Sequence, residues 1–232
     1  MDFNDSPEEA AYRAEVRQWL EANAPKKPVG VDDMEGGGSM AASKAWQAKK
    51  AAAGYAQITW PKEWGGPGGT PIQQVIFNAE EAKHPVPPNP FQIGLGMCVP
   101  TVMTFADEDT KKRFVGPALR GEEIWCQLFS EPGSGSDFAG LASTGLKDGE
   151  EWIVNGQKVW TTLAHVSRWG LLVVRTDPEA VKHAGLTAFV VDMNAPGVRR
   201  GHIHLRGSRS GSAGARAARP VPAGGRPGRG RR

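Results

Sequence analysis

The residues best suited to chemistry lie in one short polar segment, Ser130–Asp137, whose sequence is Ser-Glu-Pro-Gly-Ser-Gly-Ser-Asp. Its glycines leave backbone N–H groups open to approach and its serines add three hydroxyls, so the segment suits a ligand rich in oxygen or negative charge. It is not a dinucleotide fingerprint, because a third glycine at the required spacing is missing, and it lacks the Gly-Lys-Ser/Thr ending of a P-loop. From spacing alone, an ordinary polar turn stays open as the alternative.

A second candidate is the tripeptide Trp160-Thr161-Thr162. We expect it to end a hairpin in which a strand over 152–154 turns at Asn155-Gly156, a favoured two-residue turn, and returns along 158–160. A tryptophan followed by two hydroxyls can form one wall of a site for an aromatic cofactor, through stacking and hydrogen bonding. On residue types alone, a core tryptophan beside β-forming threonines is the simpler interpretation.

The elements that must position these segments change in kind along the chain. Capping signals and helical spacing predict helices from residue 7 to about 23, over 41–53, from 71 onward, within 95–105 and over 107–119. The period then changes, and runs rich in Val, Leu and Ile predict strands near 124–129, 152–160, 169–175 and 186–193. This order indicates an α+β fold, with an all-α domain over 1–120 and an antiparallel β domain over 121–198.

The acidic residues of these elements have structural explanations, so no catalytic residue is nominated. Glu131 is expected to brace its own loop by accepting backbone N–H groups, and Asp137 to serve as a turn residue. The helix from residue 71 is expected to bury one apolar stripe and to expose Glu80 and Glu81; the stripe consists of Ile72, Val75, Ile76 and Ala79. The scattered histidines lack the spacing of metal ligands, and the two cysteines lie in apolar contexts, which indicates core positions and no metal site.

Charge is distributed unevenly along the chain. The net charge of +3 combines ten arginines and no acid in residues 199–232 with 18 basic and 25 acidic side chains elsewhere. Because residues 199–232 are rich in Arg and Gly and poor in large apolar side chains, we expect a disordered basic tail. The tail is either an arm for nucleic acid or another polyanion, or the product of a shifted reading frame in GC-rich DNA. Its lack of lysine and aromatic residues favours the second interpretation.

The composition as a whole excludes several classes of protein. The 232 residues are 39% apolar, enough for a core, but no run of about 18 apolar residues predicts a membrane-spanning helix. The acidic start, Met1–Asp5, lacks the apolar stretch of a secretory signal. Two cysteines are too few for a disulfide scaffold, so we expect a cytoplasmic protein.

Taken together, the two polar segments resemble the signature stretches of the acyl-CoA dehydrogenase family. One signature is a Thr/Ser-Glu-Pro-x-x-Gly-Ser-Asp loop, matched by Ser130–Asp137, and the other is Asn-Gly-x-Lys-x-Trp-x-Thr/Ser, matched by Asn155–Thr162. Residues 60–66 and 121–126 also resemble family stretches in the expected order. The resemblance runs from about residue 6 to about residue 198.

The resemblance implies an FAD-dependent oxidoreductase that converts an acyl-CoA thioester to its 2,3-enoyl form while the flavin accepts the β-hydrogen. Ser136 would approach both the flavin phosphates and the CoA arm, and Trp160 would shield the ring, with Thr162 as the hydroxyl nearest N5. Leu163 and Ala164 stand where the family more often has Asn-Gly. The full set of implied cofactor-binding residues is Gln127, Leu128, Phe129, Ser130, Ser136, Trp160, Thr161 and Thr162.

The same resemblance implies a larger protein. Family members continue through a C-terminal helical domain that carries the catalytic glutamate and most of the oligomer interface, whereas the pattern here ends near Val198. We therefore expect a truncated or frameshifted chain without that glutamate, whose electron-transfer partner is unassigned and whose assembly into a homo-oligomer needs the missing region. Two alternatives stay open: a non-catalytic scaffold that binds polyanions through its arginine-rich tail, and a regulatory partner of full-length relatives.

Overall fold

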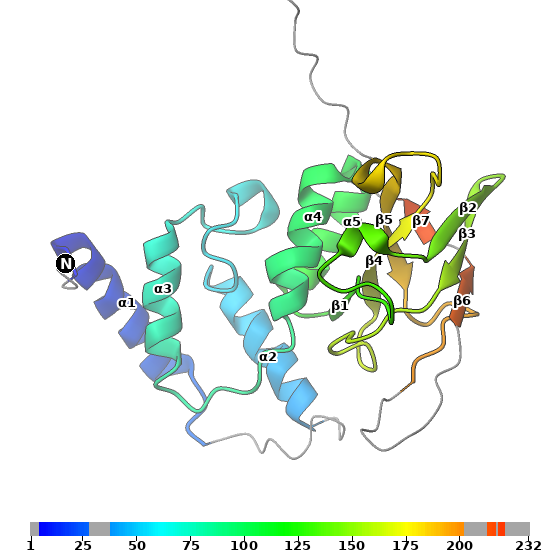
Figure 1. The fold of residues 1–232 in the computed structure, drawn as a ribbon. Coiled ribbons are helices and arrows are strands. Elements are labelled where there is room, and N and C mark those ends of the chain that lie inside the picture. The colour runs from blue at the N-terminus through cyan, green and yellow to red at the C-terminus, as the bar shows by residue number, and fades with distance from the viewer. Residues whose placement is uncertain (1–4, 28–37, 202–212, 217, 221–232) are drawn as a thin grey trace, which may run out of the picture. The chain divides into compact units, whose positions relative to one another are not determined.

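The structure is a computed structural model that describes residues 5–27, 38–201, 213–216 and 218–220. In Figure 1 the helices precede the strands, which confirms the expected α+β fold. The helices are α1 (Pro7–Asn23), α2 (Gly38–Ala52), α3 (Pro71–Glu81), α4 (Val99–Phe105) and α5 (Glu108–Leu119). The strands are β1 (Trp125–Leu128), β2 (Thr144–Asp148), β3 (Glu151–Gly156), β4 (Trp169–Arg175), β5 (Leu186–Asp192), β6 (Ala213–Arg216) and β7 (Ala218–Pro220).

These elements pack into two compact units. The first contains the described residues up to Pro90 together with Val115–Glu122, and the second contains Phe91–Phe114 and the described residues from Glu123 onward. Helix α4 and the start of α5 therefore group with the strands, which differs from a division of the chain at residue 120. Among the described helices, none has the length and apolar character needed to cross a membrane.

Two helices of the first unit begin at the capping boxes that the sequence predicts. Ser6 accepts the Glu9 N–H at 3.2 Å, and the Glu9 carboxylate accepts the Ser6 N–H at 2.7 Å. Thr70 and Gln73 repeat this exchange at the start of α3, with Pro71 in the first helical turn. Such caps satisfy N–H groups that the first helical turn leaves without partners, so they define where each helix begins.

Aromatic side chains fill the core of the first unit. The Trp19 ring lies 5.5 Å from that of Trp46 and 4.8 Å from that of Tyr55, and Tyr55 stacks on Phe77 at 4.9 Å. These rings join α1, α2 and α3 around the fully buried Leu20. Each pair adds roughly 0.5–1.5 kcal/mol to the apolar burial of its rings.

The buried face of α3 differs from the expected stripe. Ile76 and Phe77 are buried, whereas Ile72 is 45% exposed and Val75 is 58% exposed. Phe77 brings more apolar surface than either exposed residue, so its burial determines which side of α3 turns inward. The same rotation buries Glu80, and the expectation of a solvated face there is wrong.

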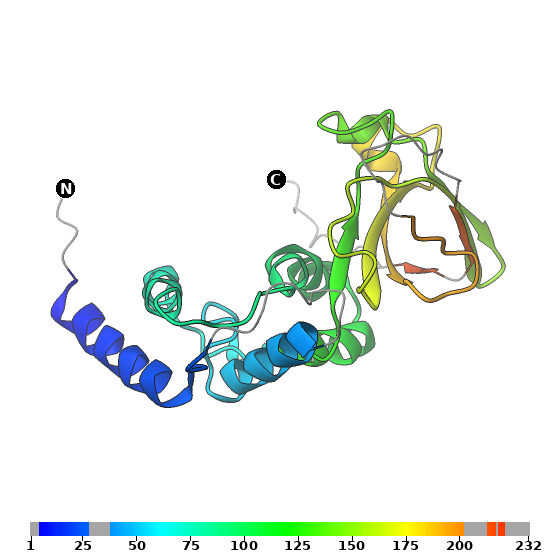
Figure 2. The same cartoon turned by 90° about the horizontal axis from the view of Figure 1, so that it is seen from below.

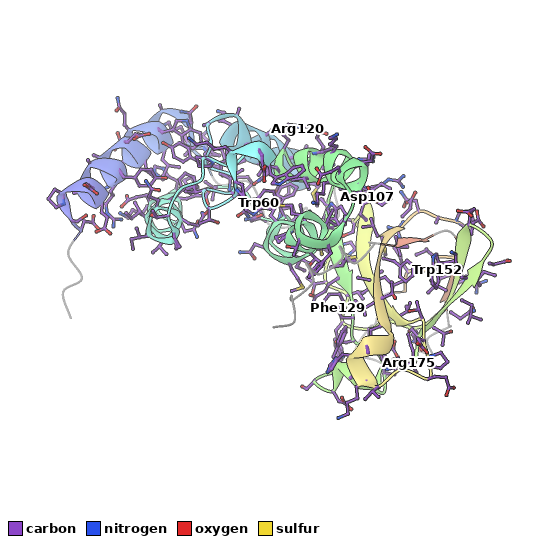
Figure 3. All side chains as sticks on the ribbon, turned by 90° about the horizontal axis from the view of Figure 1, so that it is seen from above. Trp60, Asp107, Arg120, Phe129, Trp152 and Arg175 are labelled. Atoms are coloured by element: carbon purple, nitrogen blue, oxygen red, sulfur yellow. The ribbon has the colours of Figure 1, made fainter. Side chains whose placement is uncertain are left out.

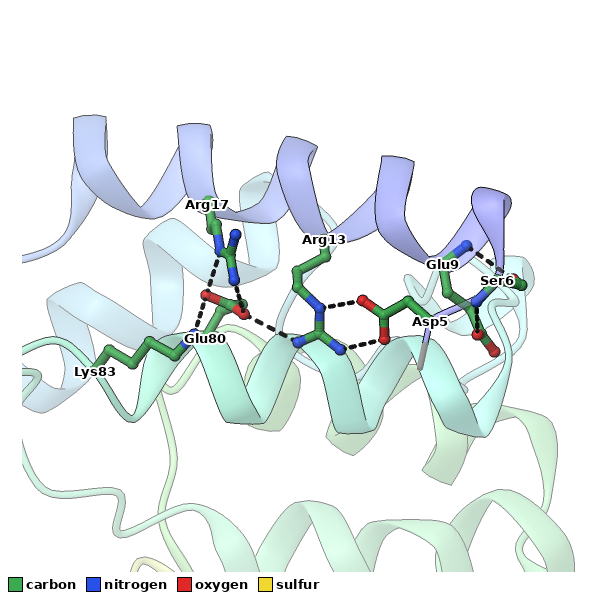
Figure 4. Close-up of polar contacts among 7 residues, drawn as sticks. All are labelled: Asp5, Ser6, Glu9, Arg13, Arg17, Glu80 and Lys83. Atoms are coloured by element: carbon green, nitrogen blue, oxygen red, sulfur yellow. Dashed lines mark hydrogen bonds and ion pairs between the residues drawn. The ribbon is translucent and has the colours of Figure 1, made fainter. Parts of the chain in front are cut away.

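Glu80 tolerates burial because three cations surround its carboxylate (Figure 4). Its side chain is only 2% exposed, and its oxygens lie 2.9 Å from Arg17 Nε, 2.7 Å from Lys83 Nζ and 3.0 Å from Arg13 Nη1. Hydrogen bonds from Arg17 first, and then from Lys83 and Arg13, lower the pKa of Glu80 to about 2, although burial acts in the opposite direction. Asp5 binds Arg13 from the other side.

We expect the Glu80→Gln substitution to lower the free energy of unfolding by roughly 3 kcal/mol at neutral pH, because it leaves three cations beside a neutral group. Since folding lowers the pKa of Glu80 from 4.5 to about 2, its contribution is present above about pH 4.5 and is lost as the pH falls toward 2. The variant should lose this part of the acid dependence. Urea unfolding at several pH values measures both effects.

The matched control is Glu108→Gln, because Glu108 is 67% exposed and pairs with Lys111 at 2.9 Å. An exposed pair of this kind contributes no more than about 1 kcal/mol, so the control should change stability little. Equal losses in the two variants would show that the buried network adds nothing to stability.

The second unit is built around a mixed sheet with the strand order β6-β3-β2-β4-β5-β7, with β1 also paired to β4. Most neighbours are antiparallel as predicted, but β1 and β2 both run parallel to β4. Strand β5 occupies one edge of β4 along its whole length, so β1 and β2 share the other edge, one after the other. Residues 129–143 therefore leave the sheet through the gap between them.

The hairpin lies one strand earlier than predicted. Strands β2 and β3 pair with Asp148 opposite Glu151, and the turn contains Gly149 at φ +60°. Asn155-Gly156 instead ends β3, and residues 157–160 form no strand. Gly156 is needed for a close approach, because a Cβ atom there would lie 1.9 Å from the Ser143 hydroxyl.

The sheet curls so that β7 comes near β3, as Figure 2 shows for the second unit. Its core contains Val154, Leu172, Val174, Phe189 and Val191. Trp152 contacts the Phe189 ring edge-on at 5.3 Å.

Both cysteines of the chain are fully buried in the second unit, which confirms their expected core positions. Burial raises the pKa of Cys98 to about 12 and that of Cys126 to about 11.

The segment 199–232, predicted to be a disordered tail, is described only in part. Within it, strand β6 pairs with β3 and strand β7 pairs with β5. Backbone pairing at sheet edges needs no large side chains, which explains strands in so apolar-poor a sequence. Residues 202–212, 217 and 221–232 lie outside the described residues, as does most of the proposed polyanion arm.

Candidate functional site

The two motifs singled out in the sequence lie against each other. The Val159 N–H donates to the Ser130 carbonyl at 2.8 Å. Lys158 donates from Nζ to the Phe129 carbonyl at 3.0 Å and to Glu131 Oε1 at 2.7 Å. The loop that leaves the sheet after β1 is thus fastened to the segment that follows β3.

Glu131 braces this arrangement as expected. Its carboxylate accepts the Ala142 N–H at 2.6 Å and the Ser143 N–H at 3.1 Å, in addition to the Lys158 ammonium. The Glu131 backbone also exchanges two hydrogen bonds with Ser134. One side chain therefore gathers three stretches of chain, namely its own loop, the approach to β2 and the exit from β3.

The charges of this pair are buried, with side chains 6% exposed at Glu131 and 7% exposed at Lys158. Burial alone raises the pKa of Glu131, but the hydrogen bonds from Lys158, Ser143 and Ala142 outweigh it and hold the pKa below its ordinary value. A carboxylate with a lowered pKa and every oxygen bonded is a poor proton acceptor. Glu131 therefore stabilises the arrangement of the loop and its neighbours.

Trp160 projects into solvent from the segment after β3. It is 74% exposed and its φ is +57°, so it is neither the strand residue nor the core tryptophan considered from sequence. Leu163, three residues on, has φ +65°. Bulky residues rarely adopt this left-handed conformation, and such strain clusters at functional sites. Thr161 and Thr162 lie between the two strained positions.

Four of the predicted cofactor-binding residues carry a hydroxyl that makes no side-chain hydrogen bond within the described residues. They are those of Ser130, Ser136, Thr161 and Thr162, and all four are at least partly exposed. By contrast, the neighbouring Ser134 hydroxyl is buried and donates to the Asp137 carbonyl at 2.5 Å. The site thus offers free donors and acceptors beside an exposed aromatic ring.

The end of β1 supplies the remaining predicted residues. The Gln127 Oε1 atom is buried and has no hydrogen-bond partner among the described residues, so it is free to accept a hydrogen bond from a ligand. The Leu128 side chain is partly buried and packs against the sheet core. The Phe129 ring lies 5.4 Å from Phe138.

A recess of about 280 Å³ opens beside the Glu131 carboxylate. Around the loop, Gly133 and Gly135 have no described atom within 4 Å of the position a Cβ would take, so a ligand can approach their backbone closely. The recess is lined by Glu131, Pro132, Gly133, Gly140, Ala142, Ser143, Gly156 and Gln157.

Arg175, at the end of β4, anchors the part of the loop that follows Asp137 (Figure 3). Its guanidinium donates to the Ala139 carbonyl at 2.7 Å and to the Lys182 carbonyl at 3.2 Å. These bonds tie the region after Asp137 to the connection between β4 and β5.

Known families and structures agree with this architecture. The N-terminal domain of acyl-CoA dehydrogenases matches residues 6–122, and their middle domain matches residues 126–215. The chain therefore belongs to the acyl-CoA dehydrogenase family. The middle-domain match extends past Val198, where the sequence pattern was expected to end, and includes most of β6.

Two curated relatives match more than four fifths of this chain. Acyl-CoA dehydrogenase IpdE1 of Mycobacterium tuberculosis is 38% identical over 193 residues, which cover 81% of this chain and 50% of the relative. Acyl-CoA dehydrogenase FadE29 of the same organism is 37% identical over 199 residues, covering 85% of this chain and 50% of the relative. The chain thus spans about half the length of the curated relatives it matches.

Solved structures show the same relation. The ChsE4–ChsE5 complex from Mycobacterium tuberculosis has a TM-score of 0.73 at 29% identity, covering 96% of this chain and 56% of that one. A glutaryl-coenzyme A dehydrogenase in complex with glutaryl-CoA has a TM-score of 0.66 at 26% identity, covering 96% and 56%.

The left-handed position of Leu163 generates a stability prediction. Asparagine tolerates this conformation better than other non-glycine residues, which accounts for its frequency at this family position. We expect Leu163→Asn to be more stable than Leu163→Ala by about 1 kcal/mol, because both lose the leucine side chain but only asparagine suits the backbone. Urea unfolding of the two variants measures the difference. An alanine variant as stable as the asparagine variant would contradict it.

Proposed function

We propose that this chain supplies flavin-binding segments of an FAD-dependent acyl-CoA dehydrogenase, an oxidoreductase that introduces a 2,3-double bond into an acyl-CoA thioester. The observation that carries the proposal is the 2.8 Å hydrogen bond from the Val159 N–H to the Ser130 carbonyl. It places the two family signatures side by side, as a shared cofactor surface requires. Bound FAD would supply the acceptor for the hydrogen that leaves the β-carbon.

The free polar groups of the site fit the flavin. The ring has a hydrogen-bonding edge, and the unpaired hydroxyls of Ser130 and Thr162 together with the buried Gln127 Oε1 offer partners for it. Trp160, exposed and adjacent, provides a flat apolar surface that can cover the ring and exclude water. Thr161 adds a second hydroxyl on the same segment.

The Ser136 region fits the charged parts of the cofactor and substrate. Ser136 is exposed, and the open backbone of Gly135 beside it allows close contact with phosphate oxygens. This favours the assignment of Ser136 to the flavin phosphates and the CoA arm. The names of the relatives support an acyl-CoA substrate, since both curated relatives described above are acyl-CoA dehydrogenases and a related enzyme was solved with glutaryl-CoA.

Glu131 and Glu80 are poor candidates for the base that removes the substrate α-proton. Both are buried and bonded to cations, and hydrogen bonding holds the pKa of each below its ordinary value. We therefore propose no proton-abstracting role for these two residues.

Gel filtration of the full chain with added FAD tests the proposal. We expect flavin absorbance bands to co-migrate with the protein, and titration of flavin fluorescence to give a saturating curve. Flavin that elutes entirely free after supplementation would overturn the proposed function.

The Thr162→Val variant tests the site residue by residue. Loss of one hydroxyl hydrogen bond should weaken FAD binding roughly three- to tenfold while leaving the fold intact. Thr104→Val is the matched control, because the exposed Thr104 hydroxyl bonds only the Pro100 carbonyl of its own helix. Equal affinity in the two variants would remove Thr162 from the site.

A further inference from the structure

We propose that Lys158 is a positioning residue for the flavin, an inference that rests on the proposed function: its ammonium orients the peptide unit between Phe129 and Ser130 so that the Ser130 N–H faces the bound ring. The observation behind this inference is the bond from Lys158 Nζ to the Phe129 carbonyl at 3.0 Å.

The planar peptide bond between Phe129 and Ser130 determines the direction of the Ser130 N–H. A trans peptide is planar, and its C=O and N–H point in opposite directions. The Phe129 carbonyl is directed at Lys158, so the N–H of Ser130, in the same peptide unit, is directed away from it. That N–H has no hydrogen-bond partner within the described residues, whereas the next carbonyl, that of Ser130, is held by the Val159 N–H.

The buried charge of Lys158 strengthens the Ser130 N–H as a hydrogen-bond donor. A cation on a carbonyl oxygen polarises the whole amide, which makes the N–H of the same unit a stronger donor. Lys158 is 7% exposed, so solvent screens its effect on the peptide only weakly. A strengthened donor favours a ligand that carries more negative charge, so Lys158 should favour reduced FAD over oxidised FAD.

Glu131 makes the lysine's position possible. Without the carboxylate 2.7 Å from Nζ, an ammonium in this interior would be costly to desolvate. The two members of the pair therefore act together, since Glu131 retains the cation and Lys158 acts on the peptide. Removing a different anchor of the same loop distinguishes a positioning role of Lys158 from a merely structural one.

The test compares Lys158→Gln with Arg175→Gln in the full chain, using affinities for oxidised and reduced FAD. Both variants remove a cation that anchors the loop, but only Lys158→Gln removes the cation from the Phe129 carbonyl, since Arg175 donates to the Ala139 carbonyl. We expect Lys158→Gln to weaken binding of reduced FAD about tenfold and of oxidised FAD less, whereas Arg175→Gln keeps the wild-type ratio of the two affinities. Lys158→Arg, which retains a cationic donor, should restore part of the ratio.

The possible results separate the two proposals. A wild-type chain that binds no FAD overturns the proposed function and this inference with it. A wild-type chain that binds FAD, with the same affinity ratio in Lys158→Gln and Arg175→Gln, leaves the proposed function standing and overturns the positioning role. If Lys158→Gln fails to fold, the Lys158→Arg and Arg175→Gln variants decide by the same ratio, and an equal ratio in both overturns the inference.

Discussion

The buried ion pair between Glu131 and Lys158 is the constraint on which the candidate site depends. Two charges removed from water destabilise a fold unless they are paired and the rest of their hydrogen-bonding groups have partners. Here the carboxylate accepts hydrogen bonds from the Ala142 and Ser143 N–H groups, and the ammonium donates to the Phe129 carbonyl. Because these partners come from separate stretches of chain, satisfying the pair also assembles the site. The interaction fixes geometry more than it adds net stability.

The sheet provides the opening that this pair then organises. Strands β1 and β2 lie in sequence along one edge of β4, so the intervening loop must leave the sheet and return to it. A loop anchored at both ends by a rigid scaffold can present glycines and hydroxyls without a costly search of conformations. Arg175 adds a third anchor through the Ala139 carbonyl. Strain at Trp160 and Leu163 is tolerated beside such an anchored framework.

Sequence reasoning succeeded where the determinants are local and failed where they are not. Both capping boxes and strand β4 were predicted at their observed positions, because caps and β-rich runs act within a few residues. The hairpin was misplaced because Asn155-Gly156 carries a turn signal, although Gly156 serves a close approach to Ser143. The buried Glu80 was missed because two of its three cations, Arg13 and Arg17, are distant in sequence. The adjacency of the two motifs followed from family resemblance, whereas the Glu131–Lys158 bond has no spacing rule that reveals it.

The burial of the cysteines has a practical consequence for studying this molecule. With pKa values raised to about 12 and about 11, Cys98 and Cys126 hold almost no thiolate at neutral pH, and no path from solvent reaches their sulfur atoms in the closed fold. Alkylating reagents and peroxide can therefore react with these cysteines only after the second unit opens. Because the first unit contains no cysteine, the rate of thiol labelling reports the opening of the second unit alone.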